Sequence, residues 1–196
     1  MNPPQTGRLV ILSGPSGSGK STVVAELLKQ CDLPLVLSVS ATTRPPRPGE
    51  IDGKHYFFVS DEEFERRRTD GAFLEWKEVF GRGHYYGTLR DQVATGLKHG
   101  RWVILEIDVE GALTVLDGGG FDPITLFIDA GDMERLERRL RDRGTEPESA
   151  IRRRLDTARR EITQRHRYQH HVINDELDRT VGEVCSILKS YAAPGV

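Results

Sequence analysis

The chain has 196 residues, of which 37% are hydrophobic and 30% are charged, and its formal net charge is -2. These values are ordinary for a globular protein with one domain, or with one core and a mobile insert. The balanced charge argues against nucleic acid or an anionic membrane as a partner, and no apolar run approaches the ~20 residues that a membrane span needs.

Apolar runs typical of strands alternate with amphipathic segments typical of helices along most of the chain. A helix after Ser60 is indicated because Ser60 is a good N-cap and Glu63 follows three residues later. The predicted strands are Arg8–Ser13, Leu35–Val39, Tyr56–Val59, Ala72–Trp76, Trp102–Ile107, Ile124–Ile128 and His171–Asn174. The predicted helices are Ser21–Gln30, one that starts at Ser60, one that starts near Met133, one that follows a loop at Gly144 and ends near His166, and Leu177–Tyr191.

This alternation predicts an α/β fold with a mostly parallel sheet covered by helices. Between about Thr42 and Gly87, however, strands follow one another with little helix, so we expect a small β-rich lobe beside the core and a cleft between them. The expected divisions of this single domain are a core of about 8–41, 88–134 and 168–196, a lobe of about 42–87, and a helical, arginine-rich segment of about 135–167.

The two cysteines, Cys31 and Cys185, both lie in apolar segments typical of helices. A disulfide framework or a zinc cluster is therefore not expected. The first seven residues lack the charged-then-apolar pattern of a signal peptide. We expect a protein of the reducing cytoplasm; the sequence does not indicate an oligomeric state.

Residues 14–21, Gly-Pro-Ser-Gly-Ser-Gly-Lys-Ser, fit the pattern G-x-x-x-x-G-K-[ST] and stand between a predicted strand and a predicted helix. The glycines let backbone N–H groups surround phosphate oxygens, Lys20 would contact the β- and γ-phosphates, and Ser21 would offer its hydroxyl to Mg²⁺. The alternative is a Gly/Ser turn that only caps a helix. The pattern predicts a P-loop NTPase core whose ATP-binding residues are Gly14, Pro15, Ser16, Gly17, Ser18, Gly19, Lys20, Ser21 and Thr22.

The chain shows no guanine-reading N-K-x-D motif of a GTPase and is too short for a motor or helicase, so its size favours a nucleoside-monophosphate-type kinase. Such a kinase needs a second anion site for the acceptor. Arg44 and Arg47 lie on a proline-stiffened loop, and guanidinium groups bind phosphate in a bidentate way. A solvated basic loop is the alternative.

Further motifs resemble those of guanylate kinases over about Arg8 to Tyr191. They are S-x-S-A-T-T-R-P-P-R-P-G-E at 38–50, F-L-E-W at 73–76, Y-Y-G-T at 85–88 and R-G-T-E at 143–146. The resemblance implies that the γ-phosphoryl group of ATP is transferred to GMP, or to dGMP, with Mg²⁺ as cofactor. It also implies that the β-rich lobe binds GMP and that the arginine-rich helices form a lid.

In that family, the residues that match Arg44, Arg47, Tyr56 and Tyr86 hold the GMP phosphate. The match to Glu75 accepts hydrogen bonds from guanine N1–H and the exocyclic amine, and the matches to Ser40 and Thr88 address the O6 side. A carboxylate suits guanine because guanine offers two adjacent donors there. Without the resemblance, Glu75 reads as an outward-facing carboxylate on a strand.

Glu106 and Asp108 end an apolar strand, where parallel sheets present functional groups. They resemble an acidic pair of the family. Three roles remain open from the sequence: contact with Mg²⁺ through water, contact with the guanine amine, or capping of the next helix.

By the same resemblance, Arg139 and Arg143 would contact ATP, Arg154 would reach the transferring phosphoryl group, and Asn174 would lie near the adenine. With Lys20, the three arginines would be the catalytic groups, acting by position and charge rather than as a general base. The alternatives for the arginines are helix ion pairs, as for Arg135, Arg152 and Arg160, or RNA binding. Two rival functions remain, a kinase of a sugar phosphate and a non-catalytic interaction module.

Overall fold

The computed structural model describes residues 7–78, 83–142 and 147–192 of the chain. At its centre lies a sheet of five strands in the order β2-β7-β1-β8-β9, and every neighbouring pair runs parallel. The predicted α/β fold with a mostly parallel sheet is therefore confirmed. The strands are β1 (Arg8–Ser13), β2 (Leu35–Leu37), β7 (Trp102–Glu106), β8 (Ile124–Asp129) and β9 (His170–Ile173).

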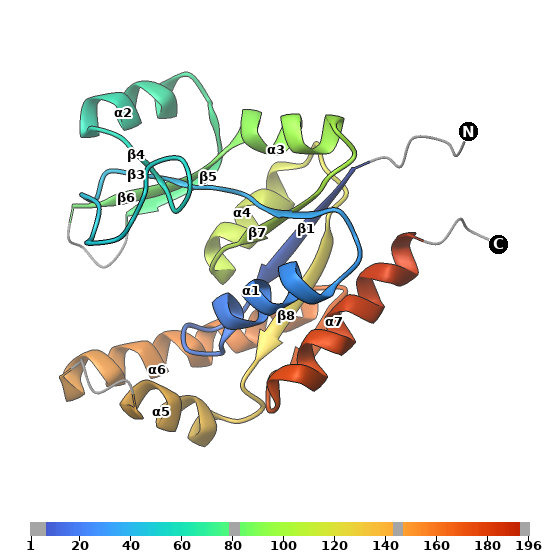
Figure 1. Cartoon of the computed structure of the whole chain (residues 1–196). Helices are drawn as coiled ribbons and strands as arrows, with labels where there is room; N and C mark the ends of the chain where they lie inside the picture. Colours follow the sequence, from blue (N-terminus) through green and yellow to red (C-terminus); the bar gives the residue numbers. More distant parts are fainter. Residues whose placement is uncertain (1–6, 79–82, 143–146, 193–196) are drawn as a thin grey trace.

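Helices cover both faces of this sheet (Figure 1). Val10 and Leu12 of β1 point into one apolar cluster, and Leu9 and Ile11 point into the cluster on the opposite face, as the alternation of a strand requires. Because both faces are buried, the strands read as continuous apolar runs in the sequence. One face carries α1 (Lys20–Gln30) and α7 (Leu177–Ala192), and the other carries α3 (Arg90–Lys98) and α4 (Val109–Gly118).

A second, smaller sheet has four strands in the order β4-β3-β6-β5, with parallel and antiparallel pairs. With the helix that covers it, we call it the small lobe. Phe64 of that helix stacks on Phe73 with ring centroids 4.5 Å apart. The Glu63 N–H donates to the Ser60 hydroxyl at 3.2 Å, so the predicted N-cap is confirmed. The elements are β3 (Ala41–Thr42), β4 (Phe57–Phe58), α2 (Asp61–Thr69), β5 (Phe73–Glu78) and β6 (Tyr85–Leu89).

The arginine-rich segment forms two consecutive helices that pack against each other along one edge of the core, drawn in orange tones in Figure 1. The pair has its own apolar seam, in which Leu136 and Leu140 pack against Ile151 and Leu155. The predicted loop residue Gly144 lies outside the described residues. The helices are α5 (Met133–Asp142) and α6 (Glu148–Ile162), and α6 passes into the 3-10 turn η1 (Thr163–Arg167).

Four elements were not indicated by the sequence: β3, β6, α3 and α4. β3 has only two residues, and β6 contains Gly87, which weakens a strand signal. α4 contains Gly111 and Gly118, which lower helix propensity, and it is started by Asp108 as N-cap. Among the described residues, none of the helices has the length and apolar character that crossing a membrane requires.

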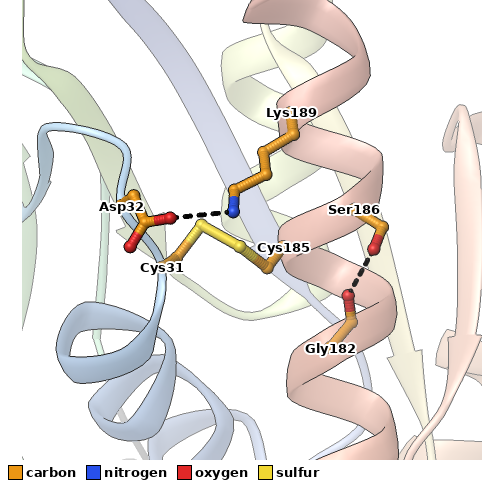
Figure 2. Close-up of a disulfide and its surroundings, with 6 residues drawn as sticks. All are labelled: Cys31, Asp32, Gly182, Cys185, Ser186 and Lys189. Atoms are coloured by element: carbon orange, nitrogen blue, oxygen red, sulfur yellow. Dashed lines mark hydrogen bonds and ion pairs between the residues drawn. A yellow bond between two sulfur atoms is a disulfide. The ribbon is translucent and has the colours of Figure 1, made fainter.

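The expectation that the cysteines do not pair was wrong. Cys31, at the C-terminal end of α1, forms a disulfide with Cys185 in α7, and their Cα atoms lie 5.8 Å apart (Figure 2). Beside it, the Lys189 ammonium lies 3.1 Å from the Asp32 carboxylate. The sequence pattern missed the pair because 154 positions separate the cysteines, and only the packing of α1 against α7 brings them together.

Candidate functional site

The loop between β1 and α1 forms the predicted phosphate cradle. Gly14, Gly17 and Gly19 have φ values of 138°, 95° and 93°, which L side chains rarely adopt. A Cβ on Gly14 would lie 2.1 Å from the Ile128 carbonyl oxygen, so no other residue fits there. α1 begins at Lys20, and the N–H groups of its first turn favour an anion in front of the helix.

Lys20 is held by the loop itself. Its ammonium donates to the carbonyl oxygens of Gly14 at 2.6 Å and Pro15 at 2.9 Å. Burial lowers the pKa of Lys20, whereas nearby carboxylates, Glu106 foremost, act to raise it. Two carbonyl oxygens of the cradle thus hold the Lys20 ammonium. Phosphate oxygens are hydrogen-bond acceptors as well, so they could take the place of these carbonyl groups.

Ser21 and Glu106 meet beside the cradle. The Ser21 hydroxyl donates to the Glu106 carboxylate, because β7 runs next to β1 and places Glu106 opposite Leu12. Thr22 follows on the exposed first turn of α1. Within the described part of the chain, the buried Ser18 hydroxyl has no hydrogen-bond partner. Two hard oxygen groups from different elements therefore lie together at the place where the sequence predicted a metal.

The opposite end of the cradle is closed by Asn174 and Arg139. The Asn174 side-chain amide donates to the Ser18 carbonyl oxygen at 2.8 Å. The Arg139 guanidinium donates to the same oxygen at 3.0 Å and to the Asn174 carbonyl oxygen at 2.6 Å. Burial lowers the pKa of Arg139 from its ordinary value. The structure thus brings both predicted residues into contact with the cradle loop.

The second helix of the arginine-rich pair, α6, also contacts the cradle. Arg154 of α6 donates to the Ser16 hydroxyl at 2.7 Å. Predicted Arg143 lies outside the described residues. Other arginines follow the ion-pair interpretation: Arg141 pairs with Glu137 and Glu148, and Arg152 lies 3.7 Å from Glu148.

Glu161, near the end of α6, is a site residue that the sequence reasoning missed. One of its carboxylate oxygens is buried and has no hydrogen-bond partner in the described part of the chain. Burial raises the pKa of Glu161, and Lys20 acts to lower it. The carboxylate therefore belongs to the electrostatic surroundings of Lys20.

On the small lobe, Arg44 is fixed in a nest of partners. Its guanidinium donates twice to the Glu50 carboxylate, at 2.9 Å each, and its Nε donates to the Tyr86 hydroxyl at 3.0 Å. It also lies over the rings of Tyr56 and Phe58, 5.4 and 5.7 Å from their centroids. The hydrogen bonds from Arg44 lower the pKa of Glu50 to about 2 and raise the pKa of Arg44. Glu50 is the last residue of the motif at 38–50, but its ion pair with Arg44 was not predicted.

The other predicted phosphate and base contacts surround this nest. Tyr56 packs edge-on against Tyr86 with ring centroids 5.7 Å apart, and burial raises the pKa of Tyr56. The Arg47 backbone N–H donates to Glu50 at 2.6 Å, and the Arg47 side chain is exposed. Ser40 lies just before β3, where its carbonyl oxygen accepts from the Phe57 N–H at 2.9 Å.

Glu75 and Thr88 form a buried pair between β5 and β6. The strand register sets them opposite each other, and the Thr88 hydroxyl donates to Glu75 Oε1 at 2.5 Å. Glu75 is only 7% exposed, so the alternative of an outward-facing carboxylate on a strand does not hold. Burial raises the pKa of Glu75, with Asp108 acting in the same direction and Thr88 in the opposite one.

Asp108 stands between the core and the small lobe. Its Oδ1 accepts from the Gly111 N–H at 2.8 Å and caps α4, which was one of the roles left open by the sequence. Its Oδ2 accepts from the Lys77 ammonium, which also lies 3.3 Å from Glu110. Lys77 was not among the predicted site residues; the available signal was its spacing of two from Glu75 on a strand, which places both on one face.

Comparisons with known proteins agree on one family. The family model described as guanylate kinase matches residues 6–191. The chain is 62% identical to a guanylate kinase of Rhodopirellula baltica over 93% of this chain and 87% of that protein. It is 46% identical to a guanylate kinase of Sphingopyxis alaskensis over 94% of this chain and 82% of that protein. A crystal structure of guanylate kinase from Anaplasma phagocytophilum has a TM-score of 0.75 and 32% identity, and the match covers 97% of this chain and 88% of that one.

Proposed function

The chain belongs to the guanylate kinase family, and from this premise we propose that the cradle and the small lobe are the two halves of the site at which it transfers the γ-phosphoryl group of ATP to GMP, giving ADP and GDP. The observation that carries this assignment is the buried Glu75–Thr88 pair, which lies against the start of α4. A kinase of a sugar phosphate would have no use for a buried carboxylate that matches two adjacent purine donors. The proposal extends to dGMP, because none of the assigned contacts depends on the ribose 2′-hydroxyl.

For ATP, the backbone of Gly14 to Gly19 would surround the β-phosphate, with Lys20 between the β- and γ-phosphates. Asn174 and Arg139, which now hold the Ser18 carbonyl oxygen, would lie on the adenine side. The intact glycine set and the fixed Lys20 support a catalytic protein over a non-catalytic interaction module, since such a module would not need them.

The residues at the cradle fit a magnesium ion. Mg²⁺ prefers hard oxygen ligands and usually takes only one or two from the protein. The Ser21 hydroxyl and the Glu106 carboxylate lie together there, and we assign them the positions nearest the metal. Asp108 has both oxygens engaged by Gly111 and Lys77, so we assign it a contact through water only. When bound with ATP, the ion would neutralise phosphate charge during transfer.

For GMP, Arg44, Arg47, Tyr56 and Tyr86 would hold the phosphate. Glu50 holds the Arg44 guanidinium in place, so little side-chain entropy would be lost if the acceptor phosphate binds it. Glu75 would accept hydrogen bonds from the two guanine donors, and Ser40 and Thr88 would contact the base on its O6 side.

Phosphoryl transfer needs little covalent chemistry from the protein, so the remaining groups act by charge and position. Lys20, Arg139, Arg143 and Arg154 would neutralise the transferring group. Arg154 is suited to this role because its contact with Ser16 already places it at the rim of the cradle.

We propose a cytoplasmic location, because ATP and GMP are the substrates. The Cys31–Cys185 disulfide is the feature that opposes this proposal, since disulfides are rare in reducing compartments. We assign no nucleic-acid or membrane partner.

The experiment that tests the function is a coupled ADP-release assay with ATP and, in turn, GMP, dGMP, AMP and ribose phosphates. Lys20→Ala is expected to lower kcat by at least about a hundredfold while GMP binding, measured by calorimetry, stays within about twofold of wild type. Lys29→Ala is the matched control, because Lys29 lies at the other, exposed end of α1 and pairs with Glu26. Turnover of a ribose phosphate but not GMP would favour the sugar-phosphate kinase. Absence of turnover with every acceptor would favour the interaction module.

A further inference from the structure

We propose that Lys77 is a positioning residue that ties the small lobe to the core through Asp108 and so sets the place of Glu75 in the guanine site. The proposal rests on the proposed function, because it assigns a purpose to the contact at that site. It concerns a residue outside every motif that indicated the family.

The first step is the geometry of β5. Side chains of a strand alternate, so Glu75 and Lys77 share one face and Trp76 lies on the other. Trp76 is 42% exposed and carries the Arg68 guanidinium 4.7 Å from its ring centroid. Glu75 and Lys77 instead face the start of α4, against which β5 packs. The strand therefore presents two opposite charges, side by side, to the core.

The second step is the surface that receives them. At the start of α4, the carboxylates of Asp108 and Glu110 both accept hydrogen bonds from the Lys77 ammonium. Lys77 thus joins a strand of the small lobe to a core helix. Burial lowers the pKa of Lys77, but the two carboxylates outweigh it and leave that pKa raised. The ammonium stays charged in a partly buried place because it has these partners.

The third step is the crowding of negative charge. A Cβ built on Gly111 would lie 3.0 Å from Glu75 Oε2 and 3.4 Å from Asp108 Oδ1, so the two carboxylates converge on the same turn of α4. Like charges this close repel unless a cation lies between or beside them. Lys77 is in contact with one of them and two residues from the other. Removing its charge leaves the lobe and the core with facing carboxylates, and the guanine-reading Glu75 would move away from α4.

The test uses Lys77→Met, which keeps the aliphatic stem and removes the charge. We expect the KM for GMP to rise about tenfold, with the KM for ATP and kcat within about twofold of wild type. Lys77→Arg is expected to restore most of the GMP affinity, because it returns a cation that can reach the carboxylates. Lys54→Met, in an exposed position of the same lobe, is the matched control and is expected to leave both KM values unchanged.

A double-mutant cycle with Asp108→Asn identifies the partner. Asparagine is also a good N-cap, so this change removes the charge of Asp108 and keeps the start of α4. In the Asp108→Asn background, Lys77→Met should change the KM for GMP by much less than tenfold. An unchanged KM in the single variant, or the same change in both backgrounds, would overturn the proposal.

The same cycle measured by thermal unfolding separates this proposal from the proposed function. If wild type fails to phosphorylate GMP but the two changes are non-additive in Tm, the contact stands and only its purpose falls. If wild type is active and the changes are additive in both Tm and KM, the tie itself is refuted.

Discussion

At the scale of single residues, the assignment of guanine selectivity to Glu75 can be tested by removing its charge alone. Glu75→Gln keeps the shape but presents an amide N–H to the guanine donors. We expect the preference for GMP over AMP, as a ratio of kcat/KM, to fall by about one to two orders of magnitude, the scale of one bidentate base contact of ~1–3 kcal/mol. Glu65→Gln, on the exposed face of α2, is the control. Unchanged base selectivity would remove Glu75 from this role.

The protonation of Glu75 gives a second prediction at this scale. Burial raises the pKa of Glu75 above its ordinary value, and only the ionised carboxylate accepts both guanine donors. As pH falls toward that raised pKa, the KM for GMP should rise more than the KM for ATP does over the same pH series. The Thr88 hydroxyl donates to the ionised form and lowers this pKa. Thr88→Val should therefore move the rise in KM to higher pH, and a rise at the same pH as in wild type would contradict the assignment.

At the scale of elements, the start of α4 is where a core helix and the small lobe meet, and Gly111 leaves room there for the Glu75 carboxylate. Alanine in place of glycine ordinarily stabilises a helix by about 0.5–1 kcal/mol. At Gly111 the added Cβ would meet Glu75 Oε2 at 3.0 Å, so the carboxylate must move. We expect Gly111→Ala to raise the KM for GMP several-fold. Gly118→Ala, in the same helix with nothing within 4 Å, should leave the KM unchanged; equal effects of the two substitutions would refute the contact.

The sequence predicted those parts of the fold and site that depend on neighbours along the chain. β1, α1 and the cradle between them follow from an apolar run, fixed glycines and Lys20, all within a short segment. Arg44 and Arg47 were expected as an anion site from their proline-rich loop, whereas the base-reading roles of Glu75 and Thr88 were expected only because the motifs resembled a known family. The spacing of two from Glu75 places Lys77 on the same strand face, but its partner Asp108 could not be predicted because it lies 31 positions away in the chain.

At the scale of the whole molecule, a disulfide joins the first helix to the last helix. α1 begins at the cradle with Lys20 and ends at Gln30, and the disulfide from the next residue, Cys31, to Cys185 fixes that end to α7. Beside the disulfide, the ion pair of Lys189 and Asp32 joins α7 to the segment that follows α1 (Figure 2). The helix that carries the cradle is therefore anchored to the last helix of the chain.

Reduction of this disulfide should lower stability more than it lowers activity. A bond that closes a loop of 154 positions restricts the unfolded chain, and removing it costs about 2–4 kcal/mol of unfolding free energy. We expect a reductant to lower the Tm of wild type and to leave the Tm of the Cys31→Ser, Cys185→Ser double variant unchanged at the lower value. Activity at temperatures well below Tm should change little, because Val23, Val24 and Leu27 still pack α1 on the sheet. Equal Tm values of oxidised wild type and the double variant would show that the anchor contributes nothing, and that the packing of α1 against α7 alone holds the cradle helix.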